Sequence, residues 1–425
     1  MMNFEKFNLH AHISTGVQAS GYTVPTPIQR QSIPPILEGK DGQGIAQTGT
    51  GKTAAFVLPI LQRLVQGSRG IVRALIIAPT RELTEQTHQS IGLLGRKTRL
   101  RSTSIYGGVN IQPQISKLSR GVDIISACPG RLLDHINRRT INLSHIEVLV
   151  LDEADLMFDM GFLPDIRKIL KHLPAGRQTL LFSATMPDDV KSLANEVLED
   201  PVRVKIGRTT PADTVSHTFY PVETHLKTAL LKNILNSTKT GPVLVFTRTK
   251  LRAKSVGYKL ERSGYNVTAL HGNMSQNKRQ EALDGFRSGR YKILVATDVA
   301  ARGIDVCGVS HVINYDIPES ATSYTHRIGR TGRACKTGDA FTFVTSRDKS
   351  PAFSITRVLG KKLKHCVIVM EDFDSTSPVR ERKSLHKRNR AQYENKNRLA
   401  KSKPRKRPKS KYPSETGSCR NRFVN

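Results

Sequence analysis

The stretch LIIAPTRE (75–82) has a counterpart far along the chain, VLVFTRTK (243–250). In both stretches a run of large apolar residues leads into a Thr-Arg pair. An apolar run that does not alternate with polar residues is typical of a strand buried on both faces of a parallel sheet. The similarity of the two stretches suggests that a buried strand and the loop after it occur twice in this chain.

Two further pairs of stretches support an internal repeat. DIISAC (123–128) matches KILVAT (292–297), and these two stretches are separated along the chain by nearly the same distance as the two Thr-Arg pairs. VLVLD (148–152) falls opposite VINYD (312–316). The second copy keeps an Asp after its strand but continues with Ile-Pro-Glu, without the acidic cluster of the first copy. We therefore expect two lobes of one topology, with the special chemistry in the first lobe. Chance alignment of strand-like segments is the alternative.

Predicted strands occur in two series, with helical-period stretches between them. Strands that alternate with helices indicate an α/β fold whose parallel sheet is covered on both faces. Between the series, GRTTPADTVS (207–216) is rich in Gly, Pro, Ser and Thr, as a linker would be. We expect tandem parallel-sheet domains at 1–206 and 217–370, joined by that linker. The predicted strands are 44–47, 74–79, 123–127, 148–152 and 179–184, then 243–246, 266–270, 292–297, 311–316 and 340–344.

The chain is strongly basic. Its 67 Lys and Arg outnumber 35 Asp and Glu, which gives a net charge of +32 and a pI near 10.3. We expect a polyanionic partner, and nucleic acid rather than a membrane surface, because no apolar run approaches the roughly 18 residues of a spanning helix. The N-terminus lacks the features of a signal peptide, and the five cysteines form no CxxC pair. We therefore expect a cytoplasmic protein without disulfides or a zinc site.

The C-terminal segment, residues 371–425, differs in composition from the rest. Residues 376–425 hold 17 Lys and Arg against 3 Asp and Glu, with few large apolar side chains. Such a composition cannot bury a core, so we expect a disordered basic tail that binds RNA without sequence specificity. For KPRKRPK (403–409), a nuclear-import signal or a merely soluble end are the alternatives.

A glycine-rich loop, AQTGTGKT (46–53), follows the first predicted strand and opens a helix. Its glycines allow backbone amides to close around phosphate oxygens, Lys52 supplies a positive charge, and the Thr53 hydroxyl can bind Mg²⁺. Ala46 stands where the general pattern GxxxxGK[ST] has its first glycine. The alternative is a turn with an exposed lysine. We predict a nucleotide site.

The segment VLVLDEADLMF (148–158) places three carboxylates directly after a buried strand. Repelling charges at a partly desolvated strand end need a cation nearby. We predict that Asp152 binds Mg²⁺ together with Thr53 and the nucleotide, usually through water. Glu153 would then orient and deprotonate the attacking water. The alternative is an acidic, solvated strand end.

These motifs together resemble those of the DEAD-box RNA helicases, in the expected order from about residue 4 to about residue 370. The phrases HGNMSQNKR, VLVFTRTK and DMGF look most like the bacterial RhlE-type group. The resemblance implies two RecA-like domains, an ATP-binding domain and a helicase C-terminal domain. The matching motifs are AQTGTGKT (46–53), PTREL (79–83), DEAD (152–155), SAT (183–185), ATDVAARGID (296–305) and HRIGRTGR (326–333).

The resemblance also implies how ATP is bound and hydrolysed. Gln29 of PTPIQ would read the adenine edge, and Phe4, or alternatively Phe7, would stack on the base unless it belongs to the core. Asp305 would contact the ribose. Arg330 and Arg333 look like arginine fingers that act with the catalytic residues Lys52, Asp152 and Glu153. The remaining residues implied for the phosphate loop are Thr48, Gly49, Thr50, Gly51 and Thr53.

Coupling and RNA contacts follow from the same resemblance. Asp155, Ser183, Thr185 and His326 would link hydrolysis to strand separation, although the hydroxyls could be helix caps and His326 an ordinary interface residue. Cys128 stands where the family usually has Thr, and a thiol is a poor hydrogen-bond donor. RNA contacts, mostly to phosphate or ribose, are implied for Thr80, Arg81, Gly107, Gly108, Pro129, Gly130, Arg131, Thr247, Arg248, Gln276, Arg279, Thr297 and Asp298.

We expect an ATP-dependent RNA helicase that separates short duplexes locally, with ATP and Mg²⁺ as cofactors and RNA as partner. Proteins of ribosome assembly or RNA decay are possible further partners. Two other functions stay open: an RNA annealer or assembly scaffold that acts through the basic tail, and a DNA-stimulated translocase on the same fold. ATP hydrolysis measured with RNA, with DNA and with neither would separate the three.

Overall fold

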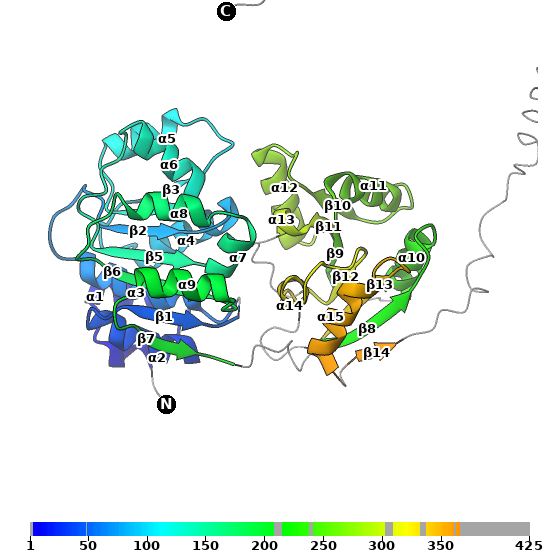
Figure 1. Ribbon diagram of the computed structural model, residues 1–425. Coiled ribbons are helices and arrows are strands. Elements are labelled where there is room, and N and C mark those ends of the chain that lie inside the picture. Colours follow the sequence, from blue (N-terminus) through cyan, green and yellow to red (C-terminus); the bar gives the residue numbers. More distant parts are fainter. Residues whose placement is uncertain are drawn as a thin grey trace, which may run out of the picture. The chain divides into compact units, whose positions relative to one another are not determined.

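Two parallel β-sheets form the framework of the protein (Figure 1). The computed structural model describes residues 3–47, 49–207, 215–237, 241–301, 309–331, 337–360 and 363–365. Helices lie on both faces of each sheet, and every strand pairing is parallel. The expected α/β class with two parallel-sheet domains is thus confirmed.

The first sheet belongs to the N-terminal lobe. Its helices are η1 (Phe4–Phe7), α1 (Ala11–Ala19), α2 (Pro27–Leu37), α3 (Lys52–Leu64), α4 (Arg81–Leu94), α5 (Gln112–Ser119), α6 (Pro129–Asn137), α7 (Ala154–Asp159), α8 (Leu163–Leu170) and α9 (Asp188–Val197). In spatial order its strands are β3 (Ser102–Ile105), β4 (Ile124–Ala127), β2 (Ala74–Ile77), β5 (Val148–Asp152), β6 (Gln178–Ser183), β1 (Gly42–Ile45) and β7 (Val202–Lys205).

The second sheet belongs to the C-terminal lobe. Its helices are α10 (Lys227–Ser237), α11 (Lys250–Glu261), α12 (Gln276–Arg287), α13 (Asp298–Ala301), α14 (Ala321–Ile328) and α15 (Lys349–Leu359). In spatial order its strands are β10 (Val267–Leu270), β11 (Ile293–Thr297), β9 (Val243–Thr247), β12 (His311–Asn314), β13 (Gly338–Val344), β8 (Val215–Pro221) and β14 (Leu363–His365).

Alternate residues of the central strands supply two separate cores. In the first sheet, Ile76 and Val150 pack in one cluster with side chains of α2, α3 and α4, whereas Leu75 and Leu149 pack in another with side chains of α6, α8 and α9. This period of two follows from the strand geometry. Because both faces are covered, each buried Leu or Ile side chain contributes about 1.5–3 kcal/mol. All residues of β5 are buried.

The internal repeat predicted from the sequence is confirmed by the strand order. The strands that carry LIIAPTRE, DIISAC and VLVLD, namely β2, β4 and β5, hold the same places in the first sheet as β9, β11 and β12 hold in the second. The loops after equivalent strands can therefore be compared between the lobes.

Four strands were not anticipated from the sequence: β3, β7, β8 and β14. All but β8 lie at a sheet edge. β8 begins at Val215, inside the segment 207–216 that was expected to be a linker, and residues 208–214 lie outside the described residues, as does the predicted tail 371–425. None of the described helices is both long enough and apolar enough to span a bilayer.

Candidate nucleotide site and strand-end loops

The predicted phosphate loop connects β1 to the N-terminus of α3. Gly49 and Gly51 have φ angles of 83° and 92°, which residues with a side chain rarely adopt. Lys52 is buried, and its Nζ donates to the Ala46 carbonyl oxygen at 2.8 Å. The backbone amides at the start of α3 and the lysine thus form an anion-binding corner. Thr48 lies outside the described residues.

Gln29 connects α2 to this loop. Its Oε1 accepts the Thr26 N–H at 2.8 Å, and its Nε2 donates to the Gly51 carbonyl oxygen at 3.1 Å. A Cβ added at Gly51 would lie 2.5 Å from that Nε2, so glycine is also required for this close approach. The side chain is fully buried. Its contact with adenine stays a prediction, and its role in holding the loop was not anticipated.

Both aromatic candidates for the adenine stack lie in the core of the first lobe. Phe4 and Phe7 are 7% and 6% exposed and belong to the apolar cluster that includes α3. Their rings meet edge to face at 5.7 Å, and Phe4 makes a similar contact with Tyr22 at 5.8 Å. Both residues thus pack in the core, and the stacking of either on adenine stays a prediction.

Asp152 is the last residue of β5 and is 3% exposed. Burial raises the pKa of its carboxyl to about 7, against the positive charge of Lys52 and with help from the neighbouring Glu153. Its Oδ1 accepts the Glu153 N–H at 3.0 Å. A buried carboxylate with a raised pKa lacks sufficient neutralising charge, and it is an oxygen donor of the kind that Mg²⁺ prefers.

Glu153 has a left-handed backbone, with φ 53° and ψ 53°. This conformation costs a residue other than glycine about 1–3 kcal/mol, and strained residues cluster at active sites, although Asn8, Arg99, Arg139 and Asp200 also have positive φ angles in this structure. It turns the chain between β5 and α7, and the side chain is 7% exposed. Among the described residues, no set of three or more His, Cys, Asp or Glu could bind a metal alone, so a Mg²⁺ ion here would need oxygen atoms of the nucleotide and water.

Asp155 is the centre of the predicted coupling residues. Its Oδ2 accepts the N–H and the hydroxyl of Thr185 at 2.9 and 2.8 Å, and its backbone N–H donates to Ser183 Oγ at 3.1 Å. His326 Nε2 lies 3.3 Å from the same Oδ2. Burial acts to raise the pKa of Asp155, but His326, Lys52 and Thr185 hold it well below its usual range. The structure thus brings all four predicted residues together.

The predicted RNA contacts of the first lobe follow β2, β3 and β4 at one edge of the sheet. Thr80 caps α4 by accepting the Leu83 N–H at 3.3 Å. Gly108 has φ 77°, and a Cβ there would meet the guanidinium of Arg81. Arg131 donates to the Val109 carbonyl oxygen at 3.0 Å. Gly107 precedes Gly108 in the loop between β3 and α5, whereas Pro129 and Gly130 are the first residues of α6.

Cys128 precedes α6 in the N-cap position, without a side-chain hydrogen bond to the helix. Its Sγ lies 3.3 Å from Thr84 Oγ1. Burial raises the pKa of the thiol to about 11, so the group is neutral at physiological pH. The sulfur thus neither caps the helix nor carries a charge that could be used in catalysis.

Several other predicted RNA contacts have protein partners in this structure. Arg81 Nη1 donates to Gln276 Oε1 at 3.0 Å, and Arg279 forms a buried ion pair with Glu82. Both carboxylate oxygens of Asp298 accept from Arg327 at 2.6 Å, next to Thr297. Their contacts with RNA stay predictions, and any such contact would compete with these partners.

In the second lobe, Thr247 is the last residue of β9 and Arg248 follows it. Thr247 is fully buried, and its Oγ1 donates to the Thr249 carbonyl oxygen at 3.4 Å. The Arg248 backbone N–H donates to Asp316 Oδ2 at 3.0 Å. Arg330 follows α14 and is 5% exposed. Asp305 and Arg333 lie outside the described residues.

Residues that hold these loops were missed at the level of sequence. Glu82 pairs with Arg279, Gln114 with Arg131 and Arg327 with Asp298, whereas Lys227 pairs with Asp316. Glu82 lies within PTREL and Arg327 within HRIGRTGR, but no role was predicted for either, and no motif marks Gln114 or Lys227. Asp316 did have a signal, because the internal repeat placed it opposite Asp152. Its cationic partners had none.

Comparison with known proteins identifies the family. Residues 26–193 match the family described as DEAD/DEAH box helicase, and residues 226–335 match the helicase conserved C-terminal domain. The chain is 44% identical over 364 residues to the DEAD-box ATP-dependent RNA helicase CshA of Geobacillus kaustophilus, covering 85% of this chain and 78% of that protein. It is 47% identical over 350 residues to the ATP-dependent RNA helicase CshA of Listeria monocytogenes, covering 82% and 67%.

Solved structures of similar proteins support the same family. S. cerevisiae Dbp5 bound to RNA and ADP BeF3 has a TM-score of 0.78 at 30% identity, over 88% of this chain and 97% of that chain. Mss116p bound to ssRNA and AMP-PNP has a TM-score of 0.74 at 27% identity, over 87% and 79%. The relatives named here are CshA proteins, so the RhlE-type assignment stays a prediction. This chain, with two RecA-like domains, belongs to the DEAD-box family of ATP-dependent RNA helicases.

Proposed function

We propose that this helicase hydrolyses ATP at the loop between β1 and α3 with Mg²⁺ held by Asp152 and Thr53. The observation that carries the proposal is the buried Asp152 carboxylate, whose pKa is raised to about 7 at the end of β5. The backbone amides from Gly49 to Lys52 would bind the phosphates, and Lys52 Nζ would leave the Ala46 carbonyl oxygen for a phosphate oxygen. When bound, Mg²⁺ supplies charge neutralisation to the outer phosphates.

Glu153 is proposed as the residue that orients and deprotonates the attacking water. A positioned general base contributes about 10²–10⁴ in rate. The left-handed backbone of Glu153 supports this role, because strain of that kind persists only where the surrounding structure enforces it. Its carboxylate accepts no hydrogen bond among the described residues and is therefore available to a water molecule.

Asp155 is proposed to couple ATP hydrolysis to strand separation through the residues that contact it. Ser183, Thr185 and His326 all contact Asp155, so a shift of the segment 152–155 would change the contacts of each of them. Arg330 and Arg333 would neutralise charge at the γ-phosphate during hydrolysis. The adenine contacts of Gln29 and Phe4 and the ribose contact of Asp305 complete the proposed nucleotide site.

RNA binding is proposed to be largely indifferent to base sequence. The candidate contacts are glycines, hydroxyl residues and arginines on loops after strands, groups that suit phosphate and ribose. ATP and single-stranded RNA would each favour one closed form that a continuous duplex cannot fit, so short duplexes would separate locally. The basic segment 371–425 would add salt-dependent attachment to structured RNA. The cytoplasmic location, the RhlE-type subgroup and partners from ribosome assembly or RNA decay stay predictions.

The test is steady-state ATP hydrolysis by wild type and Glu153→Gln, with RNA, with matched DNA and without nucleic acid. We expect RNA, not DNA, to stimulate the wild type. Glu153→Gln should lose at least about 10²-fold in rate while it still binds ATP and RNA together. Equal stimulation by DNA would point to the translocase. Intact strand annealing and separation by Glu153→Gln would point to the scaffold, and either result would overturn the proposal.

A further inference from the structure

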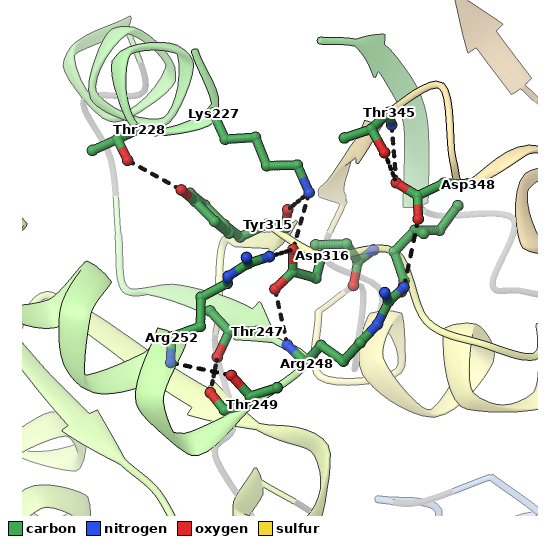
Figure 2. Close-up of polar contacts among 12 residues, drawn as sticks. Lys227, Thr228, Thr247, Arg248, Thr249, Arg252, Tyr315, Asp316, Thr345 and Asp348 are labelled. Carbon is green, nitrogen blue, oxygen red and sulfur yellow. Dashed lines mark hydrogen bonds and ion pairs between the residues drawn. The ribbon is translucent and has the colours of Figure 1, made fainter. Parts of the chain in front are cut away.

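Asp316 lies two residues after β12 and accepts hydrogen bonds from three elements of the second lobe (Figure 2). Its Oδ1 accepts from Lys227 Nζ at 3.0 Å and from Arg252 Nη1 at 2.8 Å. Its Oδ2 accepts the backbone N–H of Arg248 at 3.0 Å. The side chain is 3% exposed. Burial acts to raise the pKa of Asp316, but Lys227, the Arg248 N–H and Arg252 together hold it below its ordinary value.

Lys227 begins α10 and is as deeply buried as Asp316. Its Nζ also donates to the Tyr315 carbonyl oxygen at 2.8 Å and lies 5.5 Å from the centre of the Tyr315 ring. The Tyr315 hydroxyl in turn meets Thr228 Oγ1 at 3.1 Å. A buried ion pair is weak support for stability, since apolar residues of similar volume often replace one without loss. Stability alone therefore does not explain why two charges are buried here.

The loop that Asp316 holds is the predicted RNA-contact loop after β9. Residues 248 and 249 link β9 to α11, and Thr249 caps α11 by accepting the Arg252 N–H at 3.2 Å. Within the part of the chain that the structure describes, the Arg248 guanidinium makes two long contacts, to the Ile317 carbonyl oxygen at 3.4 Å and to Asp348 at 3.5 Å. That side chain is 47% exposed. The backbone of the loop is thus fixed by Asp316, while its arginine could exchange these partners for a phosphate.

The main chain of Asp316 contacts a second functional element. Its carbonyl oxygen accepts from Arg327 Nη1 at 2.7 Å, and Arg327 also donates to Asn314 Oδ1 at 3.1 Å. Arg327 belongs to α14, the helix that carries His326 and precedes Arg330. A single residue therefore connects the loop after β9 with the helix that leads to a proposed arginine finger.

We propose that Asp316 is a positioning residue for RNA-stimulated ATP hydrolysis: its carboxylate fixes the Thr247-Arg248 backbone for RNA contact, and its carbonyl ties that loop to α14. The inference rests on the proposed contact between this loop and RNA. Lys227 and Arg252 keep the carboxylate ionised and in place, so that it acts as a fixed acceptor for the Arg248 N–H.

Two double variants separate positioning from stability. Lys227→Met/Asp316→Asn removes both buried charges but leaves an amide oxygen that can accept the Arg248 N–H. Lys227→Met/Asp316→Leu removes the same charges and leaves no acceptor. Both remove the two members of the buried ion pair together, so neither leaves a buried charge without a partner.

The measurement is the RNA concentration that half-saturates ATP hydrolysis by the full chain, together with the ATP concentration that half-saturates RNA-free hydrolysis and the thermal unfolding midpoint. For Lys227→Met/Asp316→Asn we expect half-saturation by RNA within about twofold of wild type. For Lys227→Met/Asp316→Leu we expect an increase of about tenfold, because the Arg248 N–H is left without an acceptor. Half-saturation by ATP should stay unchanged in both.

Equal RNA half-saturation in the two double variants, or a change that follows the unfolding midpoint alone, would overturn the inference while leaving the helicase function intact. An absence of RNA stimulation in wild type would instead overturn the proposed function and this inference with it. The two failures are distinguishable because the first requires a stimulated wild type.

Discussion

Asp152 and Asp316 occupy equivalent places in the two lobes, at the carboxyl ends of the fourth strands in the sheet orders, β5 and β12. Both are 3% exposed. Their electrostatic surroundings are opposite. Burial raises the pKa of Asp152 to about 7, whereas Lys227, Arg248 and Arg252 overcome the same effect at Asp316 and lower its pKa.

The difference shows how one backbone position supports two kinds of work. A carboxylate that the protein neutralises itself is fixed and can hold a loop, as Asp316 holds the Arg248 N–H. A carboxylate that the protein leaves undercompensated can bind a cation that arrives with a ligand, as proposed for Asp152. The repeated fold thus supplies the position, and the amount of positive charge beside each carboxylate decides the function.

The largest expected effect comes from Asp152→Asn. Asparagine keeps one side-chain oxygen but loses the negative charge that helps to hold Mg²⁺, which should remove several kcal/mol of charge stabilisation, at least about 10²-fold in rate. The measurement is ATP hydrolysis at saturating RNA. Asp188→Asn, at an exposed carboxylate of α9, is the matched control and should leave the rate unchanged. A rate for Asp152→Asn within about threefold of the control would contradict the proposed Mg²⁺-binding role of Asp152, and with it the difference from Asp316.

Lys227→Ala tests the second lobe. It leaves Asp316 buried without its closest lysine, which should cost about 3–5 kcal/mol of unfolding free energy. Urea unfolding would report the loss. The double variant Lys227→Met/Asp316→Asn should have most of the wild-type unfolding free energy, since neither buried charge is then present. An unfolding midpoint that does not move in Lys227→Ala would contradict the assigned role of the lysine.

Gly51→Ala addresses the loop beside Asp152. The φ angle of 92° costs an alanine about 1–2 kcal/mol, and its Cβ would lie 2.5 Å from Gln29 Nε2. We expect ATP to bind about tenfold more weakly, as measured by nucleotide titration. Gly130→Ala is the control, because its Cβ would meet no atom within 4 Å. Equal affinities for ATP in the two variants would argue against the proposed phosphate loop.

Cys128→Thr has the smallest expected effect. It compares the two lobes at a second pair of equivalent positions. Cys128 falls opposite Thr297 in the repeat. A threonine could cap α6, worth about 0.5–2 kcal/mol, and supply a hydroxyl donor for a phosphate. We expect a slightly higher unfolding midpoint and tighter RNA binding, with unchanged ATP affinity. Cys128→Ala should show neither gain. An RNA titration identical to wild type would sink this prediction.

The sequence predicted the central strands and the phosphate loop because their signals are local. Strands buried on both faces are continuous apolar runs, as in β2 and β9, and a loop that approaches phosphates needs glycine at Gly49 and Gly51. The edge strands were missed since they are short or exposed on one face, as in β3 with its alternating burial. β8 was missed because its first residues follow a Pro- and Thr-rich segment that reads as a linker.

The partners of the site residues could not be predicted for a different reason. Lys227 reaches Asp316 from 89 positions away, and Glu82 and Arg279 are 197 positions apart. Such pairs depend on the three-dimensional arrangement of loops, which no local pattern encodes. The repeat did mark Asp316 as equivalent to Asp152, but only the structure reveals the cations that make the two aspartates different.

The most direct test of this division measures two half-saturating concentrations, of Mg²⁺ and of RNA, for ATP hydrolysis by Asp152→Asn and by Asp316→Asn. We predict that Asp152→Asn raises the value for Mg²⁺ by about tenfold or more, whereas Asp316→Asn leaves it unchanged. For RNA, Asp316→Asn should give the larger shift, because Lys227 is then buried without its carboxylate partner next to the Arg248 backbone. If both variants raised the Mg²⁺ requirement equally, the proposed difference between the two strand-end aspartates would be contradicted.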